Sequence, residues 1–254
     1  MKKVLYIIAG LAVSACALTE SESPILKEGA DASRIRIGGE IAQAYVTRAN
    51  DQGFADGDEI GIYVVDYEAG VPGELTVNGT RASNLRFTFD EAAWTWIPDH
   101  EIYYKDKNTH IDVYGYYPYG SPESIEAYSF EVQKNQADEG GNGKMGAYEA
   151  SDFLWGKAED VAPSDRTINV GFHHMMAQAK ITLVQGTGFD SAEWASLEKS
   201  VITESAIRTS TINIKTGVVT VTGSRPETGT IAHRNGNEWR CIIVPQTISA
   251  GDAL

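Results

Sequence analysis

The sequence predicts an all-β protein made of two consecutive antiparallel β-sandwich domains, of which the second is incomplete. Apolar and polar residues alternate over many short segments, which is the period of a half-buried strand. Turn residues recur between these segments, and 25 of the 254 residues are glycine. Almost no stretch has the 3.6-residue period of an amphipathic helix. Short strands, frequent turns and little helix are together typical of β-sandwiches.

A secretory leader precedes the strands. Lys2 and Lys3 are followed by an apolar run that is too short to span a bilayer. The run ends at Val13-Ser14-Ala15, directly before Cys16, and these small residues resemble the lipobox of bacterial lipoproteins. In that class the chain is cut before the cysteine, which then carries the lipid. We therefore expect a signal peptide at residues 1–15 and lipidation of Cys16.

Residues 16–32 are polar and mixed in charge, so we expect a flexible tether between the lipid and the first domain. No aspartate follows Cys16, and Glu20 and Glu22 lie just downstream. In Gram-negative lipoproteins this pattern fits the outer membrane, and acidic residues near the start favour surface display. The predicted location is therefore the cell outer membrane, with the domains on the cell surface.

The first sandwich is expected over residues 33–166. It begins with one or two strands that contain Ile35, Ile37 and Ile41. We expect Gly38-Gly39 to interrupt this stretch. The polar segment 136–147 holds four glycines and is expected to be a mobile loop. The other expected strands are 60–67, 85–89, a hairpin partner at 94–96, 111–117 and 153–155.

The second sandwich is expected over residues 167–254. Asp190 and Glu193 form the pattern of a helix start, and 192–199 is the only helix expected. A sandwich of this kind needs about seven strands. The sequence offers five or six, so we expect a small domain or a fragment of a longer protein. These strand signals lie at 168–172, 177–183, 212–214, 218–221, 230–232 and 239–244.

The net charge excludes one class of partner. The chain has a formal net charge of −14, from 21 basic and 35 acidic residues. Removal of the leader takes away Lys2 and Lys3 and no acid, so 19 basic and 35 acidic residues remain. Such a surface repels phosphate backbones, so nucleic acid is not an expected partner. With 42% hydrophobic residues, the chain is globular rather than disordered.

The cysteines and histidines give little reason to expect chemistry. If Cys16 carries the lipid, Cys241 has no disulfide partner, and its apolar neighbours suit a buried, inert thiol. His173 and His174 are adjacent, so on a strand they point to opposite faces and do not easily share one metal ion. The expected role of both histidines is structural.

An acidic cluster and several aromatic residues are the remaining site candidates. The acids Asp51, Asp56, Asp58 and Glu59 do not have EF-hand spacing, and turn chemistry explains them better than calcium. No nucleophile motif or phosphate loop occurs in the sequence. Aromatic side chains can stack on sugars, but strand alternation sends about half of them into the core. We therefore expect a non-enzymatic protein with no metal site and no cofactor.

Five segments occur in a recognisable order, behind the lipobox. The first segment is Thr47-Arg48-Ala49, followed by Phe54 and residues 57–63. The second is 87–89 with Trp94, and the third is 111–119. The fourth is 152–156, and the fifth is 170–177, which continues into 180–181. Together they resemble the fimbrillin family, the Mfa-like pilins and pilin-like lipoproteins of Bacteroidales. The resemblance covers residues 47–183 and is weaker beyond them, where the family's last strands are missing.

The resemblance implies two transthyretin-like sandwiches, export as a lipoprotein and assembly by strand exchange. In pilins of this type a protease cuts after an arginine and releases the first strand, and the groove left behind takes a strand from the next subunit. Here the first strand corresponds to residues 34–46, and the cut to the bond after Arg48. An ordinary exposed arginine beside a strand is the open alternative for Arg48.

The sequence therefore predicts a surface-anchored fimbrial subunit or pilus-associated adhesin. Its expected partners are other fimbrial subunits, the outer membrane through the lipid, and a host or bacterial surface ligand. The first alternative is a glycan-binding outer-membrane lipoprotein of a nutrient-uptake system, which would bind oligosaccharide as a monomer through exposed aromatic residues. The second is a surface hydrolase with a raised-pKa acid in a cleft.

Overall fold

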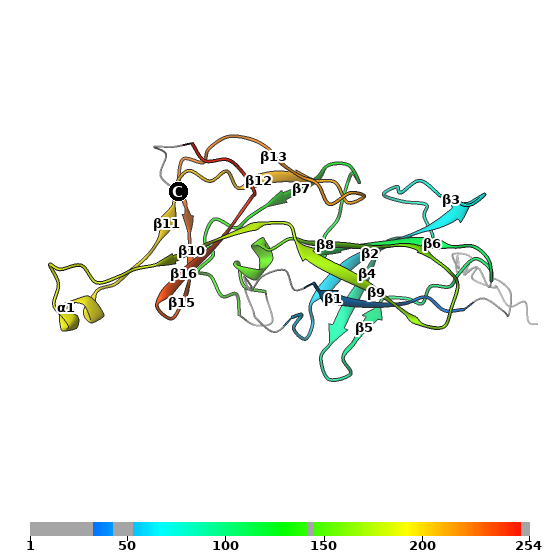
Figure 1. The fold of residues 1–254 in the computed structure, drawn as a ribbon, viewed down its shortest axis with the longest axis horizontal. Coiled ribbons are helices and arrows are strands. Elements are labelled where there is room, and N and C mark those ends of the chain that lie inside the picture. Colours follow the sequence, from blue (N-terminus) through cyan, green and yellow to red (C-terminus); the bar gives the residue numbers. More distant parts are fainter. Residues whose placement is uncertain (1–32, 43–52, 142–144, 250–254) are drawn as a thin grey trace, which may run out of the picture. The chain divides into compact units, whose positions relative to one another are not determined.

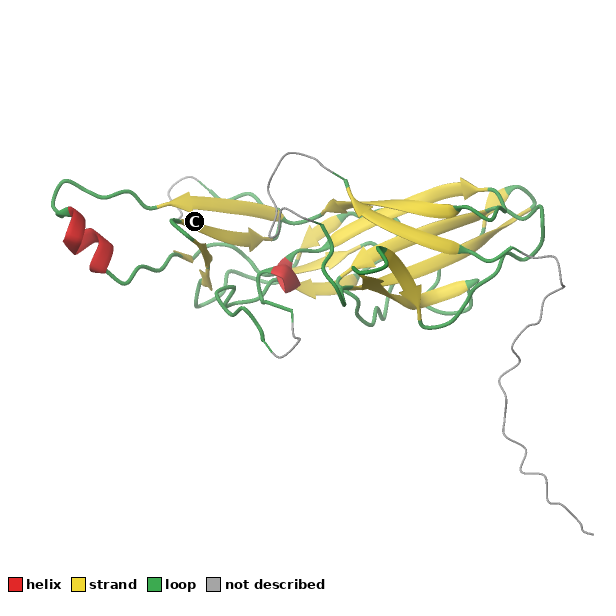
Figure 2. Ribbon diagram, turned by 90° about the horizontal axis from the view of Figure 1, so that it is seen from below, coloured by secondary structure: helices red, strands yellow, loops and turns green. Residues whose placement is uncertain are grey.

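The computed structural model describes residues 33–42, 53–141 and 145–249, and Figures 1 and 2 show its fold. Over these ranges the chain forms sixteen β-strands, the 3-10 helix η1 (Glu149–Ser151) and the α-helix α1 (Ser191–Ser196). The all-β prediction is confirmed. The expected lipidation site Cys16 and the expected cut at Arg48 lie outside the described residues.

The largest sheet has eight strands in the order β1-β9-β8-β6-β2-β4-β5, with β3 paired to β2. β1 runs parallel to β9, whereas the other pairs of this sheet are antiparallel. The strand bounds are β1 Arg36–Ile41, β2 Glu59–Glu68, β3 Val71–Pro72, β4 Ala82–Asp90, β5 Thr95–Pro98, β6 Ile111–Tyr117, β8 Leu154–Val161 and β9 Thr167–His174.

Three smaller sheets contain the remaining strands, in the orders β10-β16-β15, β11-β14 and β13-β12-β7. Their bounds are β7 Tyr128–Glu131, β10 Ala177–Thr182, β11 Ile202–Thr203, β12 Thr209–Ile212, β13 Val219–Val221, β14 Thr230–Ile231, β15 His233–Asn235 and β16 Glu238–Ile243. The expected division of the chain between residues 166 and 167 stays a prediction. Three strand pairs cross that point, because β9 joins both β1 and β8 in the large sheet and β7 pairs with β12.

β6 shows how the large sheet is buried on both faces, since all seven of its residues are buried. Ile111, Val113 and Tyr117 belong to one hydrophobic core, and Tyr114 and Tyr116 belong to another. The alternation expected from the sequence is therefore present, but the second face is covered by protein rather than by water.

Two hydrophobic cores pack against the large sheet. The first core lies among β1, β2, β4, β5, β6 and β9 and includes Ile35, Ile37, Ile60, Ile62, Phe87, Phe89, Trp96, Val113, Val170 and Phe172. The second core joins the other face of β2 and β6 to strands from the later part of the chain and includes Tyr63, Tyr114, Tyr116, Phe153, Ile212, Ile214 and Ile242. Burial of these side chains is the main stabilising term for such a fold.

The β4–β5 hairpin follows the expected alternation. Leu85, Phe87 and Phe89 are buried on β4, and β5 pairs with it in antiparallel register. Trp96 lies in the first core, whereas Trp94, in the turn, is 69% exposed and has a positive φ of 50°. Residues two apart on a strand face the same side, so the sequence predicts like environments for the two tryptophans. That prediction is wrong at Trp94, because this residue lies in the turn before β5 and not on the strand.

The expected interruption of the first strand at Gly38-Gly39 is wrong. β1 runs without a break from Arg36 to Ile41, and both glycines pair with β9, Gly38 opposite Asn169 and Gly39 opposite Val170. Backbone pairing needs no side chain, so two glycines can continue a strand where a neighbouring strand supplies the partners.

The expected helix start is confirmed at α1. Asp190 is the N-cap, and its Oδ1 accepts hydrogen bonds from the N–H groups of Ala192 at 2.8 Å and Glu193 at 2.9 Å. The Glu193 carboxylate accepts in turn from the Asp190 N–H at 3.1 Å. This reciprocal box satisfies backbone donors that a helix of six residues would otherwise leave free.

Candidate functional site

β1 lies at one edge of the large sheet and is held through its backbone. All six of its residues pair in parallel register with β9. The Ile35 N–H donates to the Ile102 carbonyl at 2.9 Å, and the Ala42 N–H donates to the Phe172 carbonyl at 2.7 Å. These bonds hold the segment at both ends as well as along the β9 side.

The side chains of β1 and of Ile35, the residue before it, alternate between the first core and the surface. Ile35 and Ile37 are buried, and Ile41 packs partly against the same core. Arg36 and Glu40 point away and are exposed. β1 and the preceding Ile35 therefore cover the first core with three isoleucines, and the departure of this segment would expose that core to water.

A cavity of about 520 Å³ lies beside β1, on the side of β5. Residues of both strands line it, including Gly39, Trp94 and Trp96. The Trp96 Nε1–H donates to the Gly39 carbonyl at 3.3 Å across this space. The sequence did not point to this contact; the one available signal was a glycine at an apolar position of the strand.

A second cavity, of about 680 Å³, lies at the end of β1 that Ile41 occupies. Its lining combines aromatic side chains with acids. The acids are Asp56, Asp58, Glu59, Glu149 and Asp152, and the aromatic residues are Phe54, Tyr117 and Tyr119. This is an acidic, partly apolar hollow at the terminus of the first strand.

Asp58, one of the acids of this hollow, has a pKa above its ordinary value. Burial raises its pKa above the ordinary 3.8, and the nearby charge of Glu149 acts in the same direction. Hydrogen bonds from the Ala55 N–H at 2.8 Å and the Tyr117 hydroxyl at 3.2 Å favour the charged form and offset part of this rise in pKa. The folded protein therefore binds the Asp58 proton more tightly than the unfolded chain does.

The raised pKa of Asp58 makes a signed prediction about stability. Because the folded state holds this proton more tightly, the group's contribution to stability is present at low pH and is lost as pH rises above 3.8 through the folded pKa. The free energy of unfolding of Asp58→Asn should therefore rise relative to that of the wild type as pH rises, by less than about 1.4 kcal/mol per pH unit. Urea unfolding at pH 4 to 7 measures the difference.

Asp106→Asn is the matched control for that experiment. The pKa of Asp106 is lowered, chiefly by the Asn108 N–H and also by the hydroxyl and N–H of Thr109. Its contribution is fully present above the ordinary 3.8 and is lost only as pH falls below that value, so between pH 4 and 7 the stability of Asp106→Asn should stay at a constant difference from that of the wild type. A rise in the relative stability of Asp106→Asn with pH as large as that of Asp58→Asn would contradict the assignment to Asp58.

The two adjacent histidines differ in environment, in line with the expectation for a strand. His173 is exposed, whereas His174 is half-buried and its Nδ1 lies 2.6 Å from Asp152 Oδ2. Asp51, from the acidic cluster, lies outside the described residues. Among the residues that the structure describes, no group of three or more His, Cys, Asp or Glu side chains could hold a metal ion.

Cys241 is fully buried on β16, and burial raises the pKa of its thiol. Its sulfur lies 3.7 Å from the Thr203 hydroxyl. A reactive cysteine needs a lowered pKa and access to solvent, and this thiol has neither.

Most of the aromatic residues that could stack on a sugar are in the cores. Of the six candidates, Tyr114, Tyr116, Tyr117 and Trp96 are buried, Tyr119 is half-buried and Trp94 is exposed. Carbohydrate sites of the expected kind present a flat aromatic surface to solvent. One exposed tryptophan in a hairpin turn gives this alternative little support.

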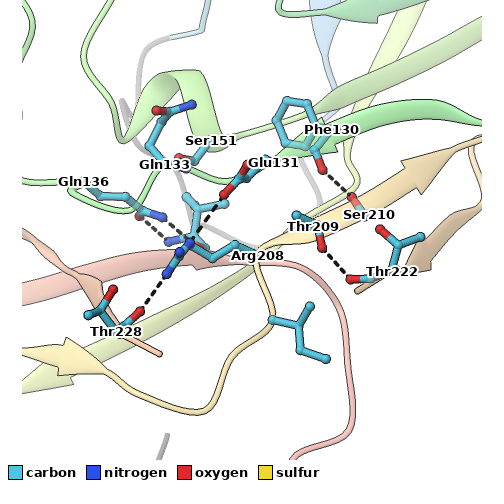
Figure 3. A network of polar contacts seen from close by, with 12 residues as sticks. Phe130, Glu131, Gln133, Gln136, Ser151, Arg208, Thr209, Ser210, Thr222 and Thr228 are labelled. Carbon is cyan, nitrogen blue, oxygen red and sulfur yellow. Dashed lines mark hydrogen bonds and ion pairs between the residues drawn. The ribbon is translucent and has the colours of Figure 1, made fainter. Parts of the chain in front are cut away.

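A polar network joins β7 to strands from the later part of the chain, as Figure 3 shows. Arg208 points between two partners: its Nη1 donates to the Thr228 carbonyl at 2.8 Å, and its Nε lies 3.6 Å from Glu131 Oε1. The Ser210 hydroxyl donates to the Phe130 carbonyl at 3.2 Å. Side-chain contacts thus reinforce the pairing of β7 with β12.

The family model for fimbrillin-like proteins matches residues 47–253. The chain belongs to the fimbrillin-like family. A curated relative from Bacteroides uniformis, a candidate fimbrium subunit named Fim1C, is 27% identical over 214 residues. The match covers 82% of this chain and 64% of that relative, so this fimbrillin-like chain spans about two thirds of the relative's length.

Solved structures of other proteins share the fold of this fimbrillin-like chain. A candidate cell adhesion protein from Bacteroides uniformis has a TM-score of 0.59 at 20% identity, with 86% of this chain and 77% of that one covered. A candidate cell adhesion protein from Bacteroides ovatus has a TM-score of 0.62 at 15% identity, with 86% and 80% covered. At such low identity the likeness is one of fold.

Within the described part of this fimbrillin-like chain, no helix is both long enough and apolar enough to cross a membrane.

Proposed function

We propose that this protein is a structural subunit of a fimbrium. It would reach the outer membrane through a lipid on Cys16 and, once a cut after Arg48 has separated it from that lipid, be joined to other subunits by strand exchange. The fimbrillin-like family and the candidate fimbrium subunit among its relatives support the first part. The position of β1 supports the strand exchange. The role is mechanical rather than enzymatic.

The observation that carries the strand exchange is the pairing of β1. It is an edge strand, and it runs parallel to β9 in a sheet whose other pairs are antiparallel. A strand at an edge can leave and be replaced without disturbing any pair other than its own. An incoming strand would recover the backbone hydrogen bonds and fill the same apolar positions.

The proposed cut fits the same segment. Arg48 follows Ile41, the last residue of β1, by seven positions in the sequence. After cleavage of that bond, β1 would stay in place only through its non-covalent contacts. A strand from another subunit could then replace it, and such a joint is long-lived because all of its contacts must be lost together before it opens.

Cleavage after Arg48 is tested on fibres assembled by cells that express the chain. N-terminal sequencing of the assembled subunit should begin at Ala49, and Arg48→Ala should abolish the ladder of multimers on a gel run without boiling. Arg36→Ala, a change at an exposed position of β1, serves as the control and should keep the ladder. Intact, lipidated Cys16 in the assembled subunit would remove the role as a cut subunit.

A further inference from the structure

β1 and Ile35, the residue directly before it, present four positions to the first core, and one of them has no side chain. Ile35, Ile37 and Ile41 occupy three of these positions, and Gly39 occupies the fourth. An apolar side chain at the fourth position would bury further surface, so its absence calls for a steric reason.

That reason is the ring of Phe172 on β9. A Cβ atom on Gly39 would lie 2.8 Å from Phe172 Cε2 and 3.2 Å from Trp96 Nε1. Phe172 is fully buried, and on its other side a Cβ on Gly115 of β6 would lie 2.7 Å from Phe172 Cζ. The ring is held between two glycines, so it has no free space into which it can move away from β1.

The neighbouring Gly38 gives a contrast within the same strand. A Cβ there would meet Asn169 Oδ1 at 2.7 Å and Thr167 Cγ2 at 2.9 Å. Both of these side chains are exposed and can rotate into solvent. Neither Gly38 nor Gly39 has a positive φ, so the backbone itself accepts other residues. The restriction at Gly39 comes from the aromatic rings alone.

We propose that the site filled by β1 selects its occupant by a glycine. The partner is an extended segment of another subunit, with apolar residues at the positions of Ile35, Ile37 and Ile41 and with glycine at the position of Gly39. A strand with a larger residue there would have to displace Phe172. This inference rests on the proposed function, because it specifies which strands the exchange accepts.

The same spacing on β6 supports the steric argument. Ile111, Val113, Gly115 and Tyr117 follow one another at every second position and face the first core. Gly115 takes the position that meets Phe172 from that side. Both β1 and β6 therefore have a glycine between apolar inward residues at the place where they approach the buried ring of Phe172.

The test uses the full chain with residues 46–51 replaced by the recognition site of a sequence-specific protease. After cleavage, the protein is mixed with an excess of a fluorescently labelled peptide of residues 33–42. Two further peptides carry Gly39→Val and Gly38→Val, and anisotropy follows the exchange into the site. We expect the Gly39→Val peptide to bind about tenfold to a hundredfold more weakly than the other two.

The outcomes separate the two proposals. If the unchanged peptide does not enter the cut protein, strand exchange at this site fails, and the selection by glycine fails with it. If all three peptides bind with similar affinity, the groove exists but the selection is refuted. Weaker binding of both valine peptides to the same degree would show a general loss of strand pairing and would also overturn the proposal.

Discussion

Phe172→Ala is expected to lower the free energy of unfolding by about 3–5 kcal/mol, the usual cost of removing a buried aromatic ring. Phe172 is fully buried and meets Phe54 edge-on, with ring centroids 5.6 Å apart. Its neighbours Gly39 and Gly115 have no side chains that could fill the space left behind. The cavity should therefore persist, which places the cost toward the upper end. Urea unfolding followed by circular dichroism measures it.

Phe189→Ala is the matched control, since Phe189 is 45% exposed and contacts Trp194 rather than the first core. It should cost less than about 1 kcal/mol. A milder variant, Phe172→Leu, keeps the experiment informative if the alanine variant does not fold. Equal losses for the Phe172 and Phe189 variants would contradict the burial of Phe172 in the first core.

The same residue allows a coupling experiment in the uncut chain. Gly39→Val should cost about 1–3 kcal/mol through overpacking against the ring. In the Phe172→Ala background the added side chain finds space, so the second change should cost much less. A double-mutant cycle gives this coupling directly, and additive losses would refute the steric contact.

The strand content was predictable because alternation is a local signal. The buried positions of β4, the hairpin to β5 and both faces of β6 follow from spacing in the sequence. What the spacing cannot give is which strands are neighbours. The parallel pairing of β1 with β9 joins Arg36 to Thr167, and no local pattern connects those residues.

The candidate site was predictable only in part. The sequence singled out the first strand and, through the family resemblance, Arg48 beside it. It treated Gly38-Gly39 as a break, because glycine carries no burial signal and is most common in turns. The meaning of Gly39 depends on Phe172 and Trp96, which reach it from distant parts of the chain.

The expectation of a mobile loop over residues 136–147 is wrong at its first residue. Gln136 is fully buried, and its N–H donates to the Ile231 carbonyl at 2.9 Å. Its side-chain amide donates from Nε2 to the Ile242 carbonyl at 2.7 Å and accepts at Oε1 from the Ile242 N–H at 2.8 Å. In a sequence, a polar side chain such as glutamine favours the prediction of a loop. Its amide has both a donor and an acceptor, however, so it can pair with a strand as a backbone amide does.

Gln136→Leu is accordingly expected to lower the free energy of unfolding by about 2–5 kcal/mol, because it leaves the N–H and carbonyl of Ile242 buried without partners. Gln136→Glu keeps the acceptor and loses the donor, so it should also destabilise the fold. Gln185→Leu is the control: Gln185 is exposed and donates to the Phe189 carbonyl at 2.7 Å, so water can replace its bond. Urea unfolding of the three variants compares them. If Gln136→Leu lowers the free energy of unfolding no more than Gln185→Leu does, the Gln136 amide does not stabilise β16. The Gln185 variant measures the cost of losing one exposed side-chain hydrogen bond.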